Sequence, residues 1–256
     1  MSRLSAALVG RKSLVCFVTA GDPNLDCLPE VIAGLARGGA DAVEVGIPFS
    51  DPIADGPVIQ AASQRALDRG TRVGEVLATV ARAREKTDVP VILMTYYNPV
   101  LRMGLPQFAA AAKDCGADGV IVTDLTPEEA LPWCEAAAEN GLGTVFLVAP
   151  TSTDDRVRAA CRLATGFVYC VSRTGVTGVG ETAWSETREL VSRVRAVTQL
   201  PALVGFGVRS AADVAAVHEF ADGAIVGSAF VEALAMQDPS GELGAFAEGF
   251  ARGLRP

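Results

Sequence analysis

The stretch Gly39-Ala-Asp-Ala-Val-Glu-Val-Gly46 decides the fold, because it carries the chain from the end of an expected helix into a short apolar strand. Related turns recur at residues 116–119 (Gly-Ala-Asp-Gly) and 221–224 (Ala-Asp-Gly-Ala), and a strand-like run follows each of them at once. Glycine can end a helix in the left-handed conformation, and Asp suits the tight turn. The repetition predicts helix-to-strand turns that lie together on one stabilising face.

Short runs rich in Val, Ile and Leu recur along the whole chain. We expect eight strands, at residues 14–19, 42–46, 91–95, 119–123, 144–149, 166–171, 202–205 and 223–226. Segments of helical periodicity, such as 28–35 and 190–197, lie between them, because parallel strands need a crossover helix. The pattern predicts an α/β fold, a single (β/α)₈ TIM barrel domain over residues 1–256. Residues 1–10 predict a short extra amphipathic helix at the N-terminus.

Charge and composition exclude several classes of partner. A net charge of −8 and a pI near 4.8 disfavour nucleic acid, whose phosphates an acidic surface repels. No run approaches the roughly 18 apolar residues of a membrane span, and the N-terminus is too short for a signal peptide. The six cysteines form no C-x-x-C pair, so neither a zinc site nor a disulfide framework is expected. We therefore expect a cytoplasmic protein that binds neither nucleic acid nor membrane.

The chemistry of a barrel of this kind lies at the carboxyl ends of its strands, where we expect long loops at 46–57, 96–106 and 172–184. The only histidine, His218, falls in a helical stretch as a surface or capping residue, which disfavours imidazole chemistry and a His-ligated metal. Lys12, Lys86 and Lys113 precede a strand or lie in a helix, so a Schiff-base nucleophile is missing. Carboxylates are left as the acid and base candidates.

Glu44 is the best placed carboxylate. Period-two alternation in the strand 42–46 puts Val43 and Val45 on one face and Glu44 on the other. Two valines suit the face that meets the helices, so Glu44 should point into the barrel, where burial raises the pKa of a carboxyl towards the range useful for proton transfer. The alternative is a structural carboxylate paired with an arginine.

Two further carboxylates lie on the loop that follows, in Ile47-Pro-Phe-Ser-Asp51-Pro-Ile-Ala-Asp55-Gly-Pro57. Three prolines stiffen this loop, which could supply a second catalytic acid. The alternative is that Asp51 and Asp55 only make side-chain turns and cap the helix that begins near Pro57.

Glycine-bearing turns follow the last three strands and predict a phosphate site. They are Gly175-Val-Thr-Gly178, Gly205-Phe-Gly207 and Gly227-Ser228. Glycine lets backbone N–H groups approach an anion, a helix N-terminus attracts it, and the Ser228 hydroxyl could donate as well. The alternative is that the glycines serve turn geometry alone.

Four motifs resemble the tryptophan synthase α family in the right order along essentially the whole chain. They are Phe17-Val-Thr-Ala-Gly-Asp-Pro23, the segment 44–57, Ser172-Arg-Thr-Gly-Val-Thr-Gly178 and Gly205-Phe-Gly207. The resemblance implies a (β/α)₈ fold in which Glu44 and Asp55 match the two catalytic carboxylates. One departure is Thr123-Asp-Leu-Thr126, where related sequences often carry prolines beside the Asp.

The resemblance also implies a substrate, indole-3-glycerol phosphate. By the same match, the indole and glycerol parts lie among Phe17, Tyr96, Tyr169 and Phe206, and Thr177 resembles a loop threonine that closes beside the catalytic Asp. The matching phosphate cradle is Gly178, Gly207, Gly227 and Ser228. The implied reaction is a retro-aldol cleavage to indole and glyceraldehyde 3-phosphate, with Glu44 moving protons and Asp55 bonding the ring N–H.

A partner is implied as well. A pyridoxal-phosphate-dependent β subunit receives the indole for the last step of L-tryptophan biosynthesis, in an α₂β₂ heterotetramer. No cofactor is expected in the present subunit, and loops that include Pro52 and Asn98 match the partner-facing side. Closure of residues 172–184 is the expected route of communication between the subunits.

Three other functions stay open on the sequence. One is a lyase that acts on the same substrate without a partner, and another is a different sugar-phosphate barrel, such as an isomerase. The third is a catalytically silent subunit that binds a phosphorylated ligand, in which Glu44 and Asp55 would be merely structural.

Overall fold

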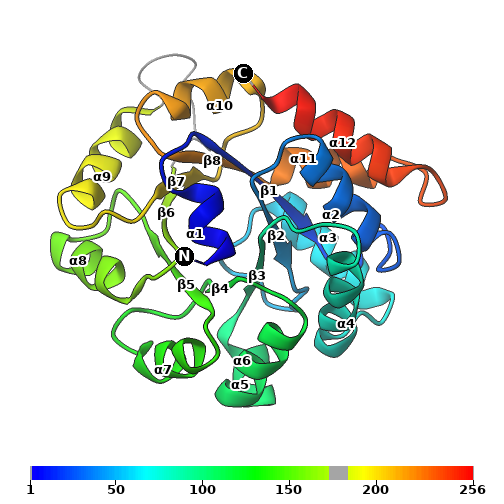
Figure 1. Ribbon diagram of the computed structural model, residues 1–256, viewed down its shortest axis with the longest axis horizontal. Coiled ribbons are helices and arrows are strands. Elements are labelled where there is room, and N and C mark those ends of the chain that lie inside the picture. Colours follow the sequence, from blue (N-terminus) through cyan, green and yellow to red (C-terminus); the bar gives the residue numbers. More distant parts are fainter. Residues whose placement is uncertain (1, 173–183, 256) are drawn as a thin grey trace.

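A closed ring of eight parallel strands forms the centre of the computed structural model, which describes residues 2–255 apart from 173–183 (Figure 1). The strands pair in chain order, and β8 closes the ring on β1. Their bounds are β1 Ser13–Thr19, β2 Ala42–Gly46, β3 Val91–Thr95, β4 Gly119–Val122, β5 Gly143–Val148, β6 Phe167–Val171, β7 Ala202–Gly205 and β8 Gly223–Val226. All eight predicted strands are confirmed, with ends that differ by at most one residue.

Helices surround the ring and cover its outer face (Figure 1). Their bounds are α1 Arg3–Leu8, α2 Leu28–Arg37, α3 Pro57–Asp68, α4 Val73–Arg84, α5 Tyr97–Met103, α6 Leu105–Asp114, α7 Leu131–Glu139, α8 Asp154–Leu163, α9 Ser185–Arg195, α10 Ala211–His218, α11 Ser228–Ala235 and α12 Leu243–Leu254. The predicted α/β barrel is therefore confirmed. None of the helices in these ranges is long and apolar enough to cross a membrane.

Alternation along the strands separates two apolar clusters. Val43 and Val45 of β2 belong to the outer cluster that packs against the helices. The inner cluster fills the barrel with one or two side chains from each strand, such as Phe17 of β1 and Ile225 of β8. Glu44 is the one acidic side chain that β2 directs to the inner side, as the alternation predicts.

The N-terminal helix α1 closes one end of the barrel. It lies across the centre of the ring of strands (Figure 1), and its Leu4 and Leu8 belong to the inner apolar cluster. A Cβ atom added to Gly119, Gly143 or Gly166 would lie within 3.3 Å of the Leu4 side chain, so these glycines at or just before the start of a strand make room for it. The predicted amphipathic helix is confirmed and seals the end opposite the strands' carboxyl termini.

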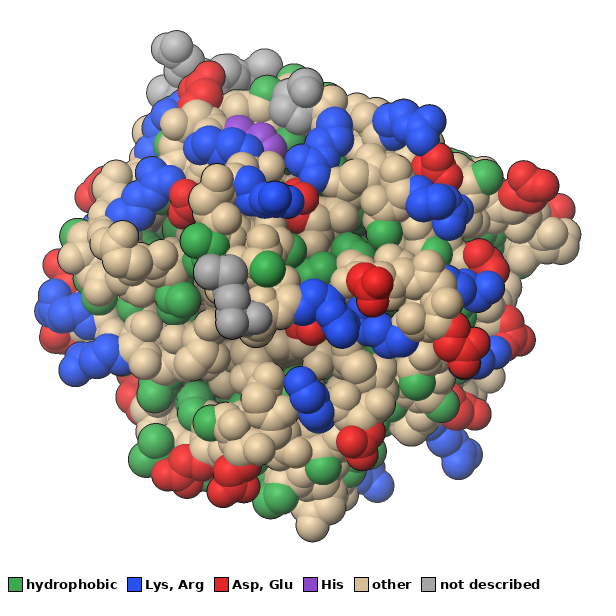
Figure 2. Space-filling view, viewed as in Figure 1, with side chains coloured by type: hydrophobic (Ala, Val, Ile, Leu, Met, Phe, Trp, Pro, Cys, Tyr) green, Lys and Arg blue, Asp and Glu red, His purple; other side chains and the backbone are tan. Residues whose placement is uncertain are grey.

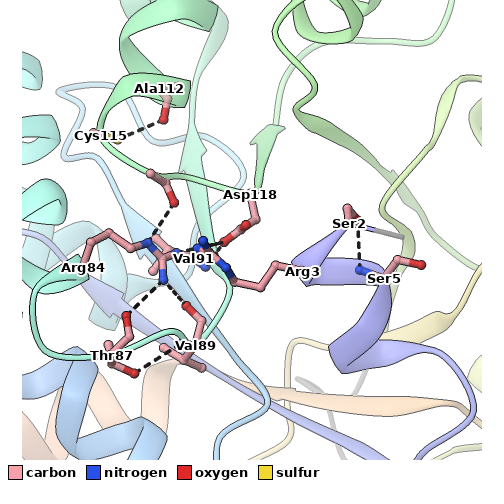
Figure 3. A network of polar contacts seen from close by, with 11 residues as sticks. Ser2, Arg3, Ser5, Arg84, Thr87, Val89, Val91, Ala112, Cys115 and Asp118 are labelled. Carbon is pink, nitrogen blue, oxygen red and sulfur yellow. Dashed lines mark hydrogen bonds and ion pairs between the residues drawn. The ribbon is translucent and has the colours of Figure 1, made fainter.

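Polar side chains tie the strands together in pairs at the same end. Each of these side chains lies just before one strand and accepts a backbone N–H from the first or second residue of the strand before it, at 2.7 to 3.0 Å. The side chains are Asp41 for the pair β1–β2, Asp118 for β3–β4, Thr165 for β5–β6 and Asp222 for β7–β8. An arginine holds each of the three aspartates, and Figure 3 shows this for Arg84 and Asp118. The repeated turns thus stabilise one face, as the sequence predicts.

Removal of the Asp118 carboxylate should destabilise the fold. It is 11% exposed and accepts hydrogen bonds from Val91 N at 3.0 Å and from Arg84 Nη2 at 2.8 Å. Asp118→Ala removes the acceptor of a strand N–H and the ion-pair partner of Arg84, whose guanidinium keeps its bonds to backbone carbonyls. We therefore expect a loss of about 3 kcal/mol in the free energy of unfolding, measured with urea. Asp26→Ala, which removes a 93% exposed carboxylate paired with Arg82, should cost under about 0.5 kcal/mol. Equal losses in the two variants would contradict this role.

The predicted loop at 96–106 is wrong. The chain forms α5 from Tyr97 and begins α6 at Leu105, with only Gly104 between them at a φ of 93°. Asp124 accepts the N–H of Tyr97 at 2.7 Å and so holds the first turn of α5, while Pro99 falls within that first turn, where proline is tolerated. The Pro and Asn residues that suggested an irregular loop instead begin a short helix.

On the face of the molecule that carries α1, the described residues form no single basic patch. Lys and Arg side chains are interspersed with Asp and Glu across it (Figure 2). Many of them form surface ion pairs, such as Arg37 with Glu248 at 2.9 Å. The expectation that nucleic acid is not a partner rests on the acidic composition and stays a prediction.

Candidate active site

A cavity of about 420 Å³ opens at the carboxyl ends of the strands. Its described lining comes from five strands and from the loops that follow β2, β6, β7 and β8, and consists of Phe17, Glu44, Asp55, Gly56, Pro57, Val58, Ile59, Met94, Tyr169, Ser172, Phe206, Gly207, Val208, Arg209, Ile225, Gly227 and Ser228. This size is typical of a pocket for a small molecule. The sequence-predicted residues Phe17, Glu44, Asp55, Tyr169, Phe206, Gly207, Gly227 and Ser228 are thus brought together.

Glu44 lies in this cavity between neighbouring strands. Its register partners are Phe17 on β1 and Ile92 on β3, and its side chain is 1% exposed. Neither carboxylate oxygen has a hydrogen-bond partner among the described residues, so the alternative of a pair with arginine is not supported by them. Burial raises the pKa of the Glu44 carboxyl to about 8. The group therefore holds a proton at neutral pH and can give it to a bound molecule.

Asp55 is held by a tyrosine from the next strand's end. The Tyr96 hydroxyl donates to Asp55 Oδ2 at 2.9 Å and accepts the N–H of Ala54 at 3.0 Å. Burial raises the pKa of Asp55 to about 6, partly opposed by the Tyr96 hydrogen bond. The other oxygen, Oδ1, is buried without a hydrogen-bond partner among the described residues. Asp55 therefore has one fixed oxygen and one available to a ligand.

Helix capping does not account for these two carboxylates. The N-cap of α3 is Gly56, with no side-chain hydrogen bond, so Asp55 does not cap the helix. Asp51 is exposed and accepts a hydrogen bond from Ser50 Oγ at 2.5 Å, a local contact outside the cavity lining. Helix capping therefore fails as an explanation of Asp55, and Asp51 lies outside the cavity.

Aromatic rings form the wall around the carboxylates. Tyr169 and Phe206 meet edge to face with ring centroids 5.8 Å apart, and the hydroxyl of Tyr169 occupies the space that a side chain at residue 205 would need. Gly46 leaves room in the same way for the ring of Phe17. Phe206 has a φ of 64°, a strained conformation for a bulky residue that is typical of functional sites. The cavity therefore offers flat apolar surfaces suited to an aromatic ligand.

The glycine turns after β7 and β8 lie on the same cavity. Gly207 has a φ of 93°, and Gly227 and Ser228 lead directly into α11. Backbone N–H groups at a helix start attract an anion. The third predicted turn, with Thr177 and Gly178, lies outside the described residues, as does most of the loop at 172–184.

Comparison with known proteins agrees with this arrangement. The family model described as "Tryptophan synthase alpha chain" matches residues 5–248. The chain is 47% identical to the tryptophan synthase alpha chain of Solibacter usitatus, over 96% of this chain and 92% of that one, and 46% identical to that of Burkholderia thailandensis, over 100% and 96%. The chain belongs to the tryptophan synthase alpha chain family.

Solved structures of the tryptophan synthase family share the fold. A chain of the aminoacrylate-bound tryptophan synthase of M. tuberculosis is 39% identical and superposes with a TM-score of 0.87, over 100% of both chains. A chain of the tryptophan synthase complex from Pyrococcus furiosus is 36% identical with a TM-score of 0.85, over 94% of this chain and 97% of that one. The closed parallel barrel is thus the fold of this family.

The basic residues excluded by sequence lie away from the cavity. His218 ends α10, and its Nε2 is 3.1 Å from the carbonyl oxygen of Ser13 at the start of β1. Lys12 donates to the carbonyl oxygen of Ala221 at 2.8 Å, and Lys86 pairs with Glu30. None of these three residues lines the cavity, so Glu44 and Asp55 are the acid and base candidates among its described lining residues.

Sequence reasoning missed two features of the cavity. Arg209 lines it two residues beyond Gly207, a position that a search for cations near the glycine turns could have found. The hydrogen bond from Tyr96 to Asp55 joins residues 41 positions apart, and nothing in the sequence pattern shows it.

Thr123, one of the departures from the family motif, donates to the carbonyl oxygen of Thr95 at 3.1 Å and so takes part in holding the end of β3.

Proposed function

We propose that Glu44 and Asp55 are the two catalytic carboxylates for cleavage of indole-3-glycerol phosphate in this cavity. Membership in the tryptophan synthase alpha chain family makes the chain a carbon–carbon lyase of tryptophan biosynthesis that forms indole and glyceraldehyde 3-phosphate and works with a β subunit. The observation that carries the residue assignment is the buried Glu44 carboxyl, whose two oxygens have no hydrogen-bond partner among the described residues. Burial of a carboxyl without a hydrogen-bond partner costs folding free energy, and such groups are typical of functional sites.

Glu44 supplies and then recovers one proton. In its protonated form it donates to C3 of the indole ring, which leaves the positive charge on the ring nitrogen. The resulting carboxylate accepts the proton of the glycerol hydroxyl as the carbon–carbon bond breaks. The electron pair of that bond returns to the ring, so indole and the aldehyde leave and Glu44 is protonated again. A pKa of about 8 suits both directions near neutral pH.

Asp55 stabilises the positive charge that develops on the ring. Its Oδ2 is fixed by Tyr96, which leaves Oδ1 to accept the indole N–H. With a pKa raised to about 6, Asp55 is mostly ionised at pH 7, and a preformed anion beside the nitrogen favours the protonated ring. Two carboxyls in one cavity thus take opposite protonation states because their surroundings differ.

The rest of the substrate fits the other walls. Phe17, Tyr169 and Phe206 offer faces and edges for the indole ring, and Tyr96 acts through Asp55. Gly207, Gly227 and Ser228 are proposed to hold the phosphate with backbone N–H groups and the serine hydroxyl. The predicted contributions of Thr177 and Gly178 concern residues outside those described.

We also propose that this subunit uses no cofactor. The ring accepts the electron pair once C3 is protonated, so neither a Schiff base nor a metal is required by the chemistry. Pyridoxal phosphate is expected on the β subunit instead. A cytoplasmic location is proposed as well, and the six free cysteine thiols are typical of a reducing compartment.

The surface beside the cavity mouth supports a β partner in an α₂β₂ complex. Ile53, next to Pro52, is 81% exposed, and Leu101, near Asn98 on α5, is 51% exposed. Apolar side chains of this size on a loop and a helix that follow neighbouring strands are typical of a protein interface.

A charge at this surface should weaken the complex. We expect Ile53→Glu to raise the dissociation constant for a purified β subunit by at least about 10-fold, because a buried unpaired carboxylate is unfavourable at an interface. Met236→Glu is the control, since Met236 is 79% exposed but follows the far end of α11. Titration calorimetry measures both, and sedimentation of the wild-type mixture gives the stoichiometry. If Ile53→Glu and Met236→Glu bind the β subunit with the same affinity, the β subunit does not bind at the surface around Ile53.

The function itself is tested by adding indole-3-glycerol phosphate to the purified chain. Equal amounts of indole and glyceraldehyde 3-phosphate should form, faster with a β subunit than without. Release of both products at a rate that β does not change would favour a partner-free lyase. Absence of cleavage in the presence of β would contradict the proposal.

A further inference from the structure

The described lining of the candidate cavity offers a substrate anion a single cation, Arg209. Of its two carboxyls, Glu44 is protonated at neutral pH and Asp55 is ionised. The whole chain carries a net charge of −8. A phosphate monoester carries a charge of about −1.5 to −2 at pH 7, so the proposed substrate adds negative charge to an acidic protein. Backbone N–H groups alone offset only part of that charge.

Arg209 lies beside the two turns assigned to the phosphate. It follows Gly207 by two residues on the way from β7 to α10, and its own N–H donates to Asp213 Oδ2 at 3.0 Å within the capping box of α10. The backbone at residue 209 is therefore anchored. The side chain remains 54% exposed at the edge of the cavity.

Among the described residues, Glu232 is the partner that competes for the guanidinium of Arg209. Its Nη2 lies 2.7 Å from Oε2 of Glu232, which is one turn beyond Ser228 on α11 and is 46% exposed. This ion pair joins the segment before α10 to α11, which begin after the glycine turns of β7 and β8. Half-exposed ion pairs of this kind contribute little to stability, because water screens the charges. A dianion that binds between the turns can therefore compete with Glu232 for Arg209.

We propose that Arg209 binds the phosphate group of the substrate, and that Glu232 restrains Arg209 beside the empty site and lowers its affinity for phosphate. The inference rests on the proposed function, because it takes the phosphate to lie at Gly207, Gly227 and Ser228. A guanidinium suits this task, because its fixed fork can bond two phosphate oxygens at once. Neither residue touches the bond that breaks, so both act on binding.

The test uses full-length protein with β subunit and measures KM and kcat for cleavage, together with competitive inhibition by inorganic phosphate. Arg209→Gln should raise both KM and the inhibition constant for phosphate by about 10-fold, the low end expected for one charged hydrogen-bonded contact, with kcat changed less than KM. Arg209→Lys should recover part of the affinity. Glu232→Gln should lower both constants by about two- to threefold, since it removes the competitor.

Arg37→Gln is the matched control. Arg37 forms an ion pair with Glu248 at 2.9 Å and is 52% exposed, much like Arg209, but it does not line the cavity. We expect its kinetic constants to stay at the wild-type values. If Arg209→Gln matches this control, or if Glu232→Gln weakens phosphate inhibition, the inference is wrong.

Failure of the proposed function has a different signature. In that case the wild-type protein would not cleave indole-3-glycerol phosphate at all. Cleavage that phosphate inhibits equally in wild type and in Arg209→Gln would leave the proposed function intact and overturn only the role of Arg209. The melting temperature of each variant shows whether a change in the constants reflects loss of fold.

Discussion

Glu44→Gln should lower the kcat for cleavage of indole-3-glycerol phosphate by about 10²- to 10⁴-fold, the contribution typical of a positioned acid and base. Glutamine keeps the size of the side chain but cannot donate an acidic proton to C3 or accept one from the glycerol hydroxyl. The loss should appear in kcat more than in KM, because the proton transfer occurs only in the transition state. A variant that is folded and cleaves at the wild-type rate would contradict the assignment.

The same substitution should stabilise the protein in alkaline solution. Burial raises the pKa of Glu44 from its ordinary 4.5 to about 8, so between these values the folded chain keeps a proton that the unfolded chain has lost. Folding then becomes less favourable as the pH rises through this window, at about 1.4 kcal/mol per pH unit. Glu44→Gln removes this dependence.

Urea unfolding of wild type and Glu44→Gln at pH 5 and pH 8 measures the effect. The variant should gain about 3 kcal/mol relative to wild type between the two values, because glutamine does not ionise. Loss of activity together with a gain in alkaline stability separates a catalytic residue from a packing residue, whose removal would lower both. An unchanged difference between the two pH values would mean that Glu44 is ionised in the folded chain.

Asp55→Asn should lower kcat by about 10²- to 10³-fold, comparable to the removal of one preorganised electrostatic contact to a transition state. The amide keeps the shape of the side chain but lacks the negative charge that favours a protonated ring. Tyr96→Phe should have a smaller effect, about 10-fold, because Tyr96 only positions Asp55 through the bond at 2.9 Å. Cleavage assays with each variant give the order.

A substrate methylated on the ring nitrogen makes the Asp55 test specific. With no N–H to accept, Asp55 loses its hydrogen bond, so wild type and Asp55→Asn should differ much less on this substrate than on the natural one. Asp51→Asn is the control on the same loop, since Asp51 is exposed and does not line the cavity. An Asp51 variant as impaired as the Asp55 variant would mean that the loop, and not the carboxylate, is what matters.

Much of this fold could be predicted from short-range patterns. Apolar runs of four to seven residues between glycine and aspartate turns located all eight strands, since strands buried on both faces are continuous in apolar residues. Period-two alternation in β2 was enough to direct Glu44 inward. These features depend on neighbouring residues only, and this is why sequence alone carries them.

Features that depend on distant residues could not be predicted. The hydrogen bond that fixes Asp55 comes from Tyr96, which follows β3, and the anchor of α5 comes from Asp124 after β4. The latter explains why a segment with Asn98, Pro99 and Gly104 folds into helices where a loop was expected. Arg209, by contrast, lies only two residues beyond Gly207, so a search for cations near the glycine turns could have found it.

The most direct test is a titration of the Glu44 carboxyl itself. Carbon-13 NMR of protein labelled at the glutamate side-chain carboxyl, compared with the Glu44→Gln variant, identifies the one resonance that belongs to this residue. We expect a midpoint near pH 8, the value to which burial raises the pKa of Glu44. A midpoint near the ordinary 4.5 would show that Glu44 is ionised at neutral pH, and it would contradict the claim that this residue protonates the substrate.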